Sequence, residues 1–517
     1  MKKKNLWMLA AILTCGLMLD SCAKEDAPAV APVPSDMQQN TNKFETDVPA
    51  ISGDAKVIAA LKQIPGVTDI KCFEHESEDT MYYFNFEQDI DHRNPALGKF
   101  KQQVVLLYKG KDHNNVLYTE GYALAGDPEV NYNRLDSLEL PAIVDMYETN
   151  YVGVEHRYHG WSLPQGFTND FTYLSTWQQS TDLHCIVTAL KASGLFAGKW
   201  VSTGVSKCGE TTAYYAYHYP NEMDAYVPYC GPYLTSLADP RVGDFVLEPT
   251  SIKADIEKVK TAYSYALNNK PLMDQLLSLL VKEYGERAGK TREDQTASLV
   301  STLIGNLFSK ESLVHISLWR DWIPTEKSSA EEFMKFLMAD ENTKYKNESQ
   351  QEIAARHRMK MRDMDLQTTF GQFSRRAAPI AKYGNRFKPY NVQKCIDLGD
   401  YVYSYAWFED LLGTEKVKML KDATIESPDN YGVTYDNGKF VKEFLEGMKT
   451  TPCKILFVFG GSDPWTGAAI SDDIVSANAN ISKLIVFEGV HTDVTTHWNK
   501  EDIQTLKKFL DPYLKKQ

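Results

Sequence analysis

The chain has 517 residues, of which 43% are hydrophobic and 12% aromatic, so it can build a large core and more than one domain. Its formal net charge is −13 at pH 7, and it shows no cluster of basic and aromatic residues that would suit a phosphate backbone. Global disorder is therefore excluded, and nucleic acid is not expected as a partner.

The first residues are typical of an exported chain. Lysines at positions 2–4 precede an apolar run over residues 6–19, which has the length of a signal peptide and is too short to span a membrane. The run ends at Cys22 in a pattern that resembles a bacterial lipobox, although Asp20 replaces the usual small residue. Residues 1–22 are predicted to be a lipoprotein signal peptide with Cys22 as the lipidated residue. The alternative is a leader cut nearby, with Cys22 removed or unmodified.

The stretch over residues 23–43 has the composition of a flexible tether. It is rich in Ala, Pro, Ser, Asn and Gln and shows no apolar period, so it has little to bury in a core. Such a tether directly after Cys22 is what a lipid-anchored protein needs. The predicted location is the outer membrane or surface of a bacterial cell, reached by export; no oligomeric state is predicted.

Short extended runs dominate the first part of the chain, and from residue 140 strands alternate with helices. The early runs predict consecutive antiparallel strands, and the later alternation predicts a parallel sheet. The extended runs are 81–86, 104–108 and 115–118; the alternating elements are a strand at 151–156, a helix at 174–192, a strand at 199–203, a helix at 210–219 and a strand at 224–229.

Between residues 237 and 405 the strand pattern stops and helical periodicity replaces it. Strand character returns at 454–459 and 483–487, and a helix over 503–510 closes the chain. The sequence therefore predicts one sheet interrupted by a helical cap, with core parts over 44–236 and 406–517 and the cap over 237–405. The helices predicted in the cap are 252–268, 270–286, 292–307, 329–338 and 350–365.

Residues 204–209, with the sequence GVSKCG, lie between a predicted strand and a predicted helix. A serine at such a corner is held in a strained turn that exposes its hydroxyl, and the next amide faces the position where an oxyanion forms. Cys208 stands where G-x-S-x-G has its second glycine, and Gly209 follows one residue later. Ser206 is thus a candidate nucleophile, with an ordinary buried turn as the alternative.

The partners of such a serine follow in the order acid, then histidine, in α/β-hydrolases. Here the strand at 454–459 runs into a loop with Asp463, and the strand at 483–487 runs into a loop with His491. A serine hydroxyl needs a neutral imidazole to take its proton, and the imidazole needs an oriented carboxylate. We predict an α/β-hydrolase core with an inserted, mainly helical cap, in which Ser206 is the nucleophile, His491 the base and Asp463 the orienting acid.

A metal site is the competing interpretation of this C-terminal cluster. Asp493 and His497 lie just past His491 and could join it as ligands. The spacing matches no H-E-x-x-H motif, and a metal would leave the glycine-framed serine unexplained. The triad is therefore favoured, and no metal or other cofactor is expected.

Four further residues are candidates for transition-state or substrate contacts. The backbone amide of Lys207 is predicted to be the first oxyanion donor, because it follows Ser206 at a helix N-terminus. The loop over 155–160 occupies the place expected for the second donor, and Tyr158 could donate from its amide or its hydroxyl. Glu155 and Glu210 are candidate substrate-binding carboxylates.

Both carboxylates also have a structural interpretation, which is the preferred one. Glu155 is expected to form a buried ion pair with Arg157, because buried charges are usually paired. Glu210 lies in the first turn of the predicted helix, where the helix dipole favours a carboxylate; the alternative is an anchor for a substrate amine.

Four ordered stretches carry a family resemblance: 91–92 with 100–103, 155–160 with 162–164, 204–209, and 461–465 with His491. With them the chain resembles the secreted serine exopeptidases that cut after proline, closest to the prolyl tri- and tetrapeptidyl aminopeptidases and more distantly to the lysosomal Pro-Xaa carboxypeptidase and dipeptidyl peptidase family. The resemblance implies peptide substrates cut near their N-terminus, often after proline. That family usually has Gly-Ser-Lys-Gly-Gly at the elbow, from which Cys208 departs.

Two other functions remain open from the sequence. An esterase or lipase uses the same triad for acyl transfer, and an exported binding protein could keep the fold without activity. Release of a chromophore from a prolyl peptide amide or from a short-chain ester separates the two enzymes. Covalent labelling by an organophosphonate that disappears in Ser206→Ala separates an enzyme from a binding protein.

Overall fold

The computed structural model describes most of the chain from residue 50 onward. The predicted signal peptide, Cys22 and the predicted tether lie outside the described residues, as do Asp493, His497 and the helix expected at 350–365. The described residues are 50–75, 77, 79–124, 140–164, 167, 169–247, 253–284, 291, 292, 295, 296, 299, 303, 320–337, 388–402, 414, 418, 425–461, 463–487, 489, 491 and 498–516.

A single sheet forms the centre of the molecule, with the strand order β1-β2-β3-β5-β4-β6-β7-β8-β9. The first three strands and β5 pair antiparallel, and all pairs from β5 to β9 are parallel. The strands are β1 (Val67–Glu74), β2 (Thr80–Asp89), β3 (Lys99–Leu107), β4 (Asn115–Thr119), β5 (Asn150–Val154), β6 (Trp200–Val205), β7 (Ala225–Tyr229), β8 (Ile455–Gly460) and β9 (Ile481–Val486).

The position of β4 corrects one sequence-based prediction. The run at 115–118 was expected to pair antiparallel with the strand before it, but β3 pairs with β5, and β4 lies parallel between β5 and β6. Every residue of β5 and β6 is buried, as is expected of parallel strands covered on both faces. The loop after β4 therefore lies beside the loop after β6, which contains Ser206.

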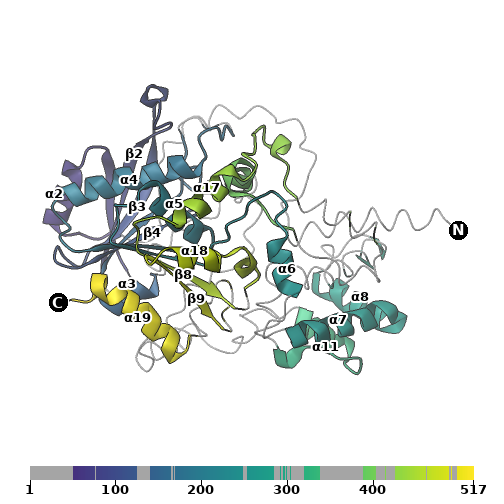
Figure 1. The fold of residues 1–517 in the computed structure, drawn as a ribbon. Coiled ribbons are helices and arrows are strands. Elements are labelled where there is room, and N and C mark those ends of the chain that lie inside the picture. The colour runs from purple at the N-terminus through teal and green to yellow at the C-terminus, as the bar shows by residue number, and fades with distance from the viewer. Residues whose placement is uncertain are drawn as a thin grey trace.

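Helices cover both faces of the sheet (Figure 1). One apolar cluster joins α2, α4, α5, α17 and α18 to one face, and a second joins α3 and α19 to the other. A sheet with a layer of helices on each face is the α/β-hydrolase architecture predicted from the sequence. The bounds are α2 (Ala55–Gln63), α3 (Ala142–Tyr147), α4 (Thr176–Ala192), α5 (Lys207–His218), α17 (Lys439–Met448), α18 (Asp472–Ala477) and α19 (Lys500–Leu514).

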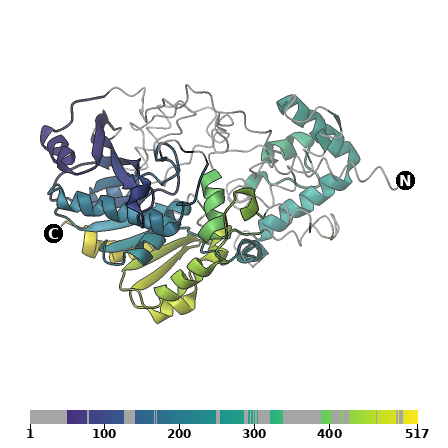
Figure 2. The ribbon, with the colours of Figure 1, turned by 90° about the horizontal axis from the view of Figure 1, so that it is seen from above.

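Within the described residues, all the named elements between β7 and β8 are helices, and α7, α8 and α11 share an apolar cluster of their own. In Figure 2 these helices form a group beside the sheet. They correspond to the helices expected at 252–268, 270–286 and 329–338. The bounds in this insertion are α6 (Arg241–Leu247), α7 (Lys253–Asn268), α8 (Lys270–Tyr284), η5 (Arg320–Trp322), α11 (Ala330–Leu337), α14 (Lys388–Gln393) and the π-helical turn η6 (Lys394–Leu398).

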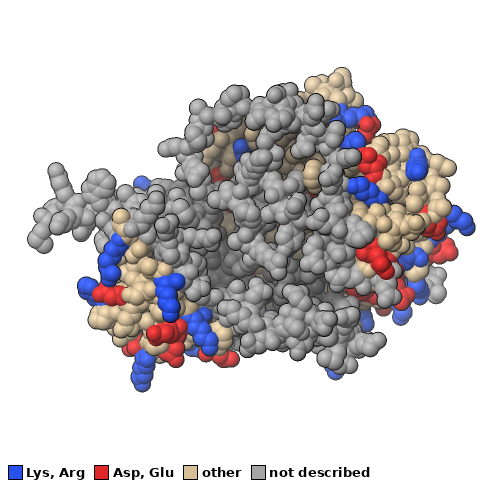
Figure 3. Space-filling model, turned by 180° about the vertical axis from the view of Figure 1, so that it is seen from behind, with Lys and Arg blue, Asp and Glu red and all other residues tan. Residues whose placement is uncertain are grey.

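Three short helices complete the description: η2 (Pro95–Leu97), η8 (Pro428–Asn430) and η9 (Pro464–Ala468). Within the described residues, no helix combines the length and the apolar character needed to cross a bilayer. The face in Figure 3 shows basic and acidic side chains interspersed on its described surface. Exposed pairs of this kind, such as Lys270 with Asp274 at 2.7 Å, are screened by solvent and contribute little to stability.

Candidate active site

Ser206 occupies a sharp, strained corner between β6 and α5. Its backbone has φ 60° and ψ −126°, a conformation that a residue with a side chain adopts only when its surroundings impose it. The Ser206 amide donates to the Tyr229 carbonyl on β7 at 2.9 Å, and the Ser206 carbonyl accepts from the Glu210 amide at 2.9 Å. The corner is thus fixed from both sides, which is the backbone geometry expected of a nucleophile elbow.

The glycines around Ser206 are required by close backbone contacts. A Cβ on Gly204 would lie 2.4 Å from the Cys208 carbonyl oxygen, and a Cβ on Gly209 would lie 2.3 Å from the Tyr229 carbonyl oxygen. The residue whose backbone packs directly against β7 is therefore 209, not 208. This explains why the second glycine comes one position later than in G-x-S-x-G.

The three residues predicted to form a triad lie together. His491 Nε2 is 2.8 Å from Ser206 Oγ, and His491 Nδ1 is 2.8 Å from Asp463 Oδ2. They follow the carboxyl ends of three parallel strands: β6, β8 and β9. Because these ends meet at one edge of the sheet, side chains separated by up to 285 positions along the chain form one hydrogen-bonded series.

Asp463 is completely buried and held by neighbours that the sequence did not reveal. Its Oδ1 accepts the Trp465 amide at 3.0 Å, and the Trp465 ring lies 4.3 Å from the His491 ring. Burial, with Asp463 as the next cause, raises the pKa of the Cys230 thiol far above its usual value, so that thiol stays protonated and donates to the Asp463 carboxylate. These contacts fix the carboxylate that faces His491.

Cys230, Asp463 and His491 also form a group whose possible ligand atoms lie within 4.8 Å of one another. Two of these side chains are already joined by the hydrogen bond between Nδ1 and Oδ2 at 2.8 Å. Asp493 and His497, which were the other ligands in the competing metal hypothesis, lie outside the described residues. The contacts present are therefore those of an oriented imidazole.

The six cysteines after residue 22 bear no disulfide: positions 72, 185, 208, 230, 395 and 453 all carry free thiols, and all but Cys185 are buried. In an exported chain an even count permits bridges. Here the thiols are free, and the five buried ones fill core positions as small apolar side chains.

The loop that touches the elbow is the one after β4, and this changes the predicted oxyanion site. A Cβ on Gly121 would lie 2.8 Å from Lys207 Cγ and 2.9 Å from the Cys208 amide nitrogen. Lys207 Nζ donates to the Gly121 carbonyl at 2.7 Å. In α/β-hydrolases the second oxyanion donor comes from the loop after this central strand. The loop in the position of the second oxyanion donor is therefore 120–124, not 155–160.

Tyr158 does not fit the role of oxyanion donor that the sequence suggested. Its amide donates to the Ser162 carbonyl at 2.9 Å, so that amide is already engaged. Its ring packs against both Phe167 and Phe171, with centroid distances of 5.6 and 5.7 Å. Burial raises the pKa of its hydroxyl to about 12, while a hydrogen bond from the Tyr173 backbone lowers it. Tyr158 is part of an aromatic cluster that supports its own loop.

Glu155 joins two loops instead of binding substrate. It is fully buried, and Oε1 accepts the Leu124 amide at 3.0 Å. Its Oε2 accepts the Trp161 and Ser162 amides at 3.0 and 2.9 Å and the Ser162 hydroxyl at 2.7 Å. Because these donors use both oxygens, the candidate role of Glu155 in substrate binding is not supported. Its hydrogen bonds to Leu124 and Ser162 connect the 120–124 loop to the 155–162 segment and help to hold the 120–124 loop in place.

The predicted ion pair between Glu155 and Arg157 is wrong. Arg157 is buried and pairs with Asp182 on α4, with Nε to Oδ2 and one terminal nitrogen to Oδ1 both at 2.7 Å. His92 Nε2 lies 2.7 Å from the same Oδ1. The need of Arg157 for a buried partner was predicted correctly, but the partner lies 25 positions away.

Glu210 is buried on the first turn of α5 and faces a cavity of about 10 Å³ lined by Gln179, Lys207, Tyr214 and Gln393 among others. Among the described residues, Glu210 Oε2 has no hydrogen-bond partner, and the same holds for Gln179 Nε2, Tyr214 Oη and Gln393 Oε1. Burial raises the pKa of Glu210 to about 8, and the Lys207 charge partly opposes this. The cavity has the size of about one water molecule, so it suits a buried water better than a substrate amine.

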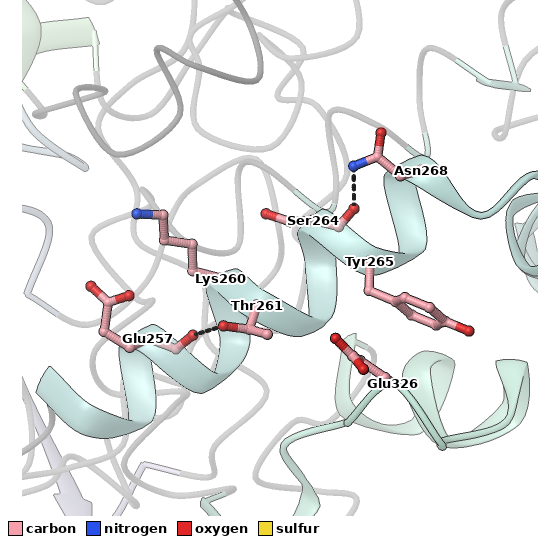
Figure 4. A pocket seen from close by; sticks show the side chains of 7 residues that line it. All are labelled: Glu257, Lys260, Thr261, Ser264, Tyr265, Asn268 and Glu326. Carbon is pink, nitrogen blue, oxygen red and sulfur yellow. Dashed lines mark hydrogen bonds between the residues drawn. The ribbon is translucent and has the colours of Figure 1, made fainter.

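A larger hollow of about 440 Å³ lies on the helical insertion (Figure 4). Figure 4 shows that its lining side chains come from successive turns of α7, with Glu326 opposite. None of the residues of the Ser206 site is among the residues that line this hollow. Its lining residues are Glu257, Lys260, Thr261, Ser264, Tyr265, Asn268 and Glu326.

The part of the chain that contains the elbow matches a known protein family. The family model for PS-10 peptidase S37 matches residues 53–241, which include Glu155 and Ser206. The prolyl tri/tetrapeptidyl aminopeptidase of Streptomyces mobaraensis is 25% identical over 396 residues, covering 74% of this chain and 69% of that protein.

Among solved structures, the proline iminopeptidase of Mycobacterium smegmatis is 10% identical, covers 83% of this chain and 98% of its own, and has a TM-score of 0.33. VinJ is 11% identical, covers 80% and 96% of the two chains and has a TM-score of 0.34. These values are low, so the strand order and the strained serine carry the fold assignment. With the matched family model and the Streptomyces relative, they support a serine peptidase on an α/β-hydrolase fold, similar in sequence to the S37 peptidases.

Proposed function

We propose that the chain is a serine exopeptidase that removes short peptides from the N-termini of its substrates through an acyl-enzyme on Ser206. The observation that supports this most directly is the hydrogen-bonded series of Ser206, His491 and Asp463, at 2.8 Å for each step. It joins a half-buried alcohol at a strained corner to a base and a buried acid, which is the arrangement that activates a serine for acyl transfer.

In the proposed mechanism His491 Nε2 takes the Ser206 proton as the oxygen attacks the carbonyl carbon of the peptide. Asp463 accepts the Nδ1 proton, which sets the tautomer and stabilises the imidazolium. The Lys207 amide and an amide of the 120–124 loop bind the oxyanion. His491 then protonates the leaving amine, the C–N bond breaks, and a water activated by His491 hydrolyses the ester.

Action near the N-terminus, with proline before the cut, is the finer part of the proposal. Its support is the Streptomyces relative, which is described as a prolyl tri/tetrapeptidyl aminopeptidase. The helical insertion between β7 and β8 adds a physical reason, because it joins two strands that border the site. A covered site admits the ends of peptides more readily than folded chains.

Three chromogenic substrates test this proposal: Ala-Ala-Pro p-nitroanilide with a free amine, the same peptide acetylated, and p-nitrophenyl acetate. We expect the free peptide to be cleaved about 10–100-fold faster, in kcat/KM, than the acetylated one, because charge-assisted recognition of an amine is worth about 1.5–3 kcal/mol. Equal rates for the two peptides would contradict exopeptidase action. Ester cleavage without peptide cleavage would favour the esterase. If the protein cleaves none of the three substrates and an organophosphonate does not label it, a binding protein is favoured.

We also propose that the chain is exported and held at a bacterial membrane by a lipid on Cys22, with residues 23–43 as the tether. The support is the leader pattern and the polar composition after it. Cys22→Ser is expected to move the protein from the membrane fraction to the soluble fraction and to remove the lipid mass from the mature N-terminal peptide. Cys15→Ser, in the same leader, is the matched control and is expected to stay membrane-bound. Membrane attachment of Cys22→Ser equal to wild type would contradict the anchor.

A further inference from the structure

Two consecutive side chains of the elbow hold the same glycine. Lys207 Nζ donates to the Gly121 carbonyl at 2.7 Å, and Cys208 Sγ accepts the Gly121 amide at 3.1 Å. Both elbow side chains are buried. Gly121 is therefore fixed at both of its backbone polar groups by the two residues that follow the nucleophile.

The contact is so close that only glycine fits at position 121. A Cβ there would lie 2.8 Å from Lys207 Cγ and 2.9 Å from both the Lys207 carbonyl carbon and the Cys208 nitrogen. The loop backbone thus lies directly against the peptide whose neighbouring amide, that of Lys207, is the expected first oxyanion donor.

We propose that Lys207 and Cys208 are positioning residues that orient the two peptide planes flanking Gly121, and thereby hold the Tyr122 amide as the second oxyanion donor. The proposal rests on the proposed peptidase function. A trans peptide is planar, so the Gly121 carbonyl and the Tyr122 amide belong to one rigid unit, and fixing the first fixes the direction of the second. A cationic donor on that carbonyl also polarises the unit and strengthens its N–H as a donor.

The surroundings of Lys207 agree with a fixed position for its ammonium group. Nζ lies 5.6 Å from the ring centroids of both Tyr122 and Tyr390, a distance at which cation–π attraction contributes. Burial lowers the pKa of Lys207 to about 8, although the Glu210 carboxylate opposes this. Placing an ammonium group in such a site is unfavourable unless its bonds compensate, and the Gly121 carbonyl supplies one of them.

Cys208 has a corresponding set of contacts on the other side of Gly121. Its thiol lies 3.3 Å from Glu120 Oε2, to which it donates, while it accepts from the Gly121 amide. A glycine at position 208, as G-x-S-x-G requires, could make neither contact. The departure from the motif at this position therefore adds a link between the elbow and the oxyanion loop.

The test compares Lys207→Met with Lys191→Met on α4. Lys191 is a matched control because its Nζ also donates to a backbone carbonyl, that of Glu222, and lies over an aromatic ring, that of Trp200. Lys207→Met is expected to lower kcat for the peptide anilide about 10–100-fold with KM within about threefold, since the oxyanion contact strengthens only in the transition state. The Ki of a peptide boronate, which forms a tetrahedral adduct, is expected to rise in the same proportion. Lys191→Met is expected to change neither quantity.

The cysteine is tested by Cys208→Gly and Cys208→Ser. Glycine removes the acceptor and is expected to lower kcat about 3–10-fold, whereas serine keeps an acceptor and is expected to restore most of the loss. If Lys207→Met does not fold, as its melting temperature against Lys191→Met would show, the two Cys208 variants decide the question.

Two results would overturn the proposal while leaving the peptidase function intact. One is a folded Lys207→Met enzyme whose kcat and boronate affinity stay within about twofold of wild type. The other is a change confined to KM, which would make Lys207 a substrate-binding residue. Failure of the proposed function looks different, because wild type itself would then cleave no peptide. In that case the rate of organophosphonate labelling of Ser206, compared between wild type and Lys207→Met, still reports on the oxyanion site.

Discussion

Ser206→Ala is expected to reduce kcat for peptide cleavage by about 10⁶-fold, because a triad acts as a unit and loss of its nucleophile removes nearly all of its contribution. The Oγ that is lost bonds to His491 Nε2 at 2.8 Å, while the corner itself is held by backbone bonds to Tyr229 and Glu210. Alanine keeps those bonds. The variant should therefore fold normally and bind uncleaved peptide with unchanged affinity, which isothermal titration measures.

Ser206→Gly is the informative companion to this variant. Glycine adopts positive φ without strain, so the φ of 60° at this corner should be easier to form, while the nucleophile is equally absent. Both variants are expected to be inactive, and the glycine variant is expected to melt no lower than the alanine variant. Peptidase activity in either purified variant above about 10⁻³ of wild type would exclude Ser206 as the nucleophile, because residual catalysis without a triad is weak.

The triad positions could be predicted from the sequence because each residue directly follows a recognisable buried strand. Ser206, Asp463 and His491 come after β6, β8 and β9, and parallel strands bring their carboxyl ends to one edge whatever the length of chain between them. The long helical insertion between β7 and β8 does not disturb this, because an insertion on a loop leaves the register of the sheet unchanged. Local patterns were therefore sufficient for these three residues.

The oxyanion loop could not be found in the same way, because it depends on which strands are neighbours. The residues of β4 look like those of any short buried strand, and nothing local shows that β4 crosses over to lie between β5 and β6. If β4 paired antiparallel with β3, its loop would lie away from the elbow, and the 155–160 loop would be the better candidate. In the fold, the Tyr158 amide of that loop bonds to the Ser162 carbonyl.

Charge pairing shows the same limit. The sequence correctly indicated that buried charges need partners, but it suggested the nearest residue along the chain. In the fold, Arg157 reaches Asp182 on α4, and Glu155 is satisfied by backbone amides and one hydroxyl. A partner on another element is invisible until the packing of α4 against the sheet is known. The same holds for Cys208, whose departure from the motif is explained by Gly121 on a neighbouring loop.

Asp463→Asn is expected to lower kcat by about 10⁴-fold through the tautomer of His491 rather than through the fold. The asparagine oxygen can still accept the Trp465 amide, as Asp463 Oδ1 does at 3.0 Å. Its NH₂ group would then face His491 Nδ1, which must become the acceptor, so the proton moves to Nε2. An imidazole with a proton on Nε2 cannot take the proton of Ser206.

The double variant Ser206→Ala with Asp463→Asn separates this explanation from a loss of structure. If the acid acts only through His491, the double variant should be no less active than Ser206→Ala alone, because members of one catalytic unit are not additive. Asp502→Asn is the matched control: Asp502 is a buried carboxylate that accepts the Asn499 amide at 3.1 Å in the capping box of α19. It should lower the melting temperature while kcat stays near wild type. A decrease in kcat of less than about tenfold in Asp463→Asn would contradict the orienting role, since a wrongly protonated base cannot support catalysis near the wild-type rate.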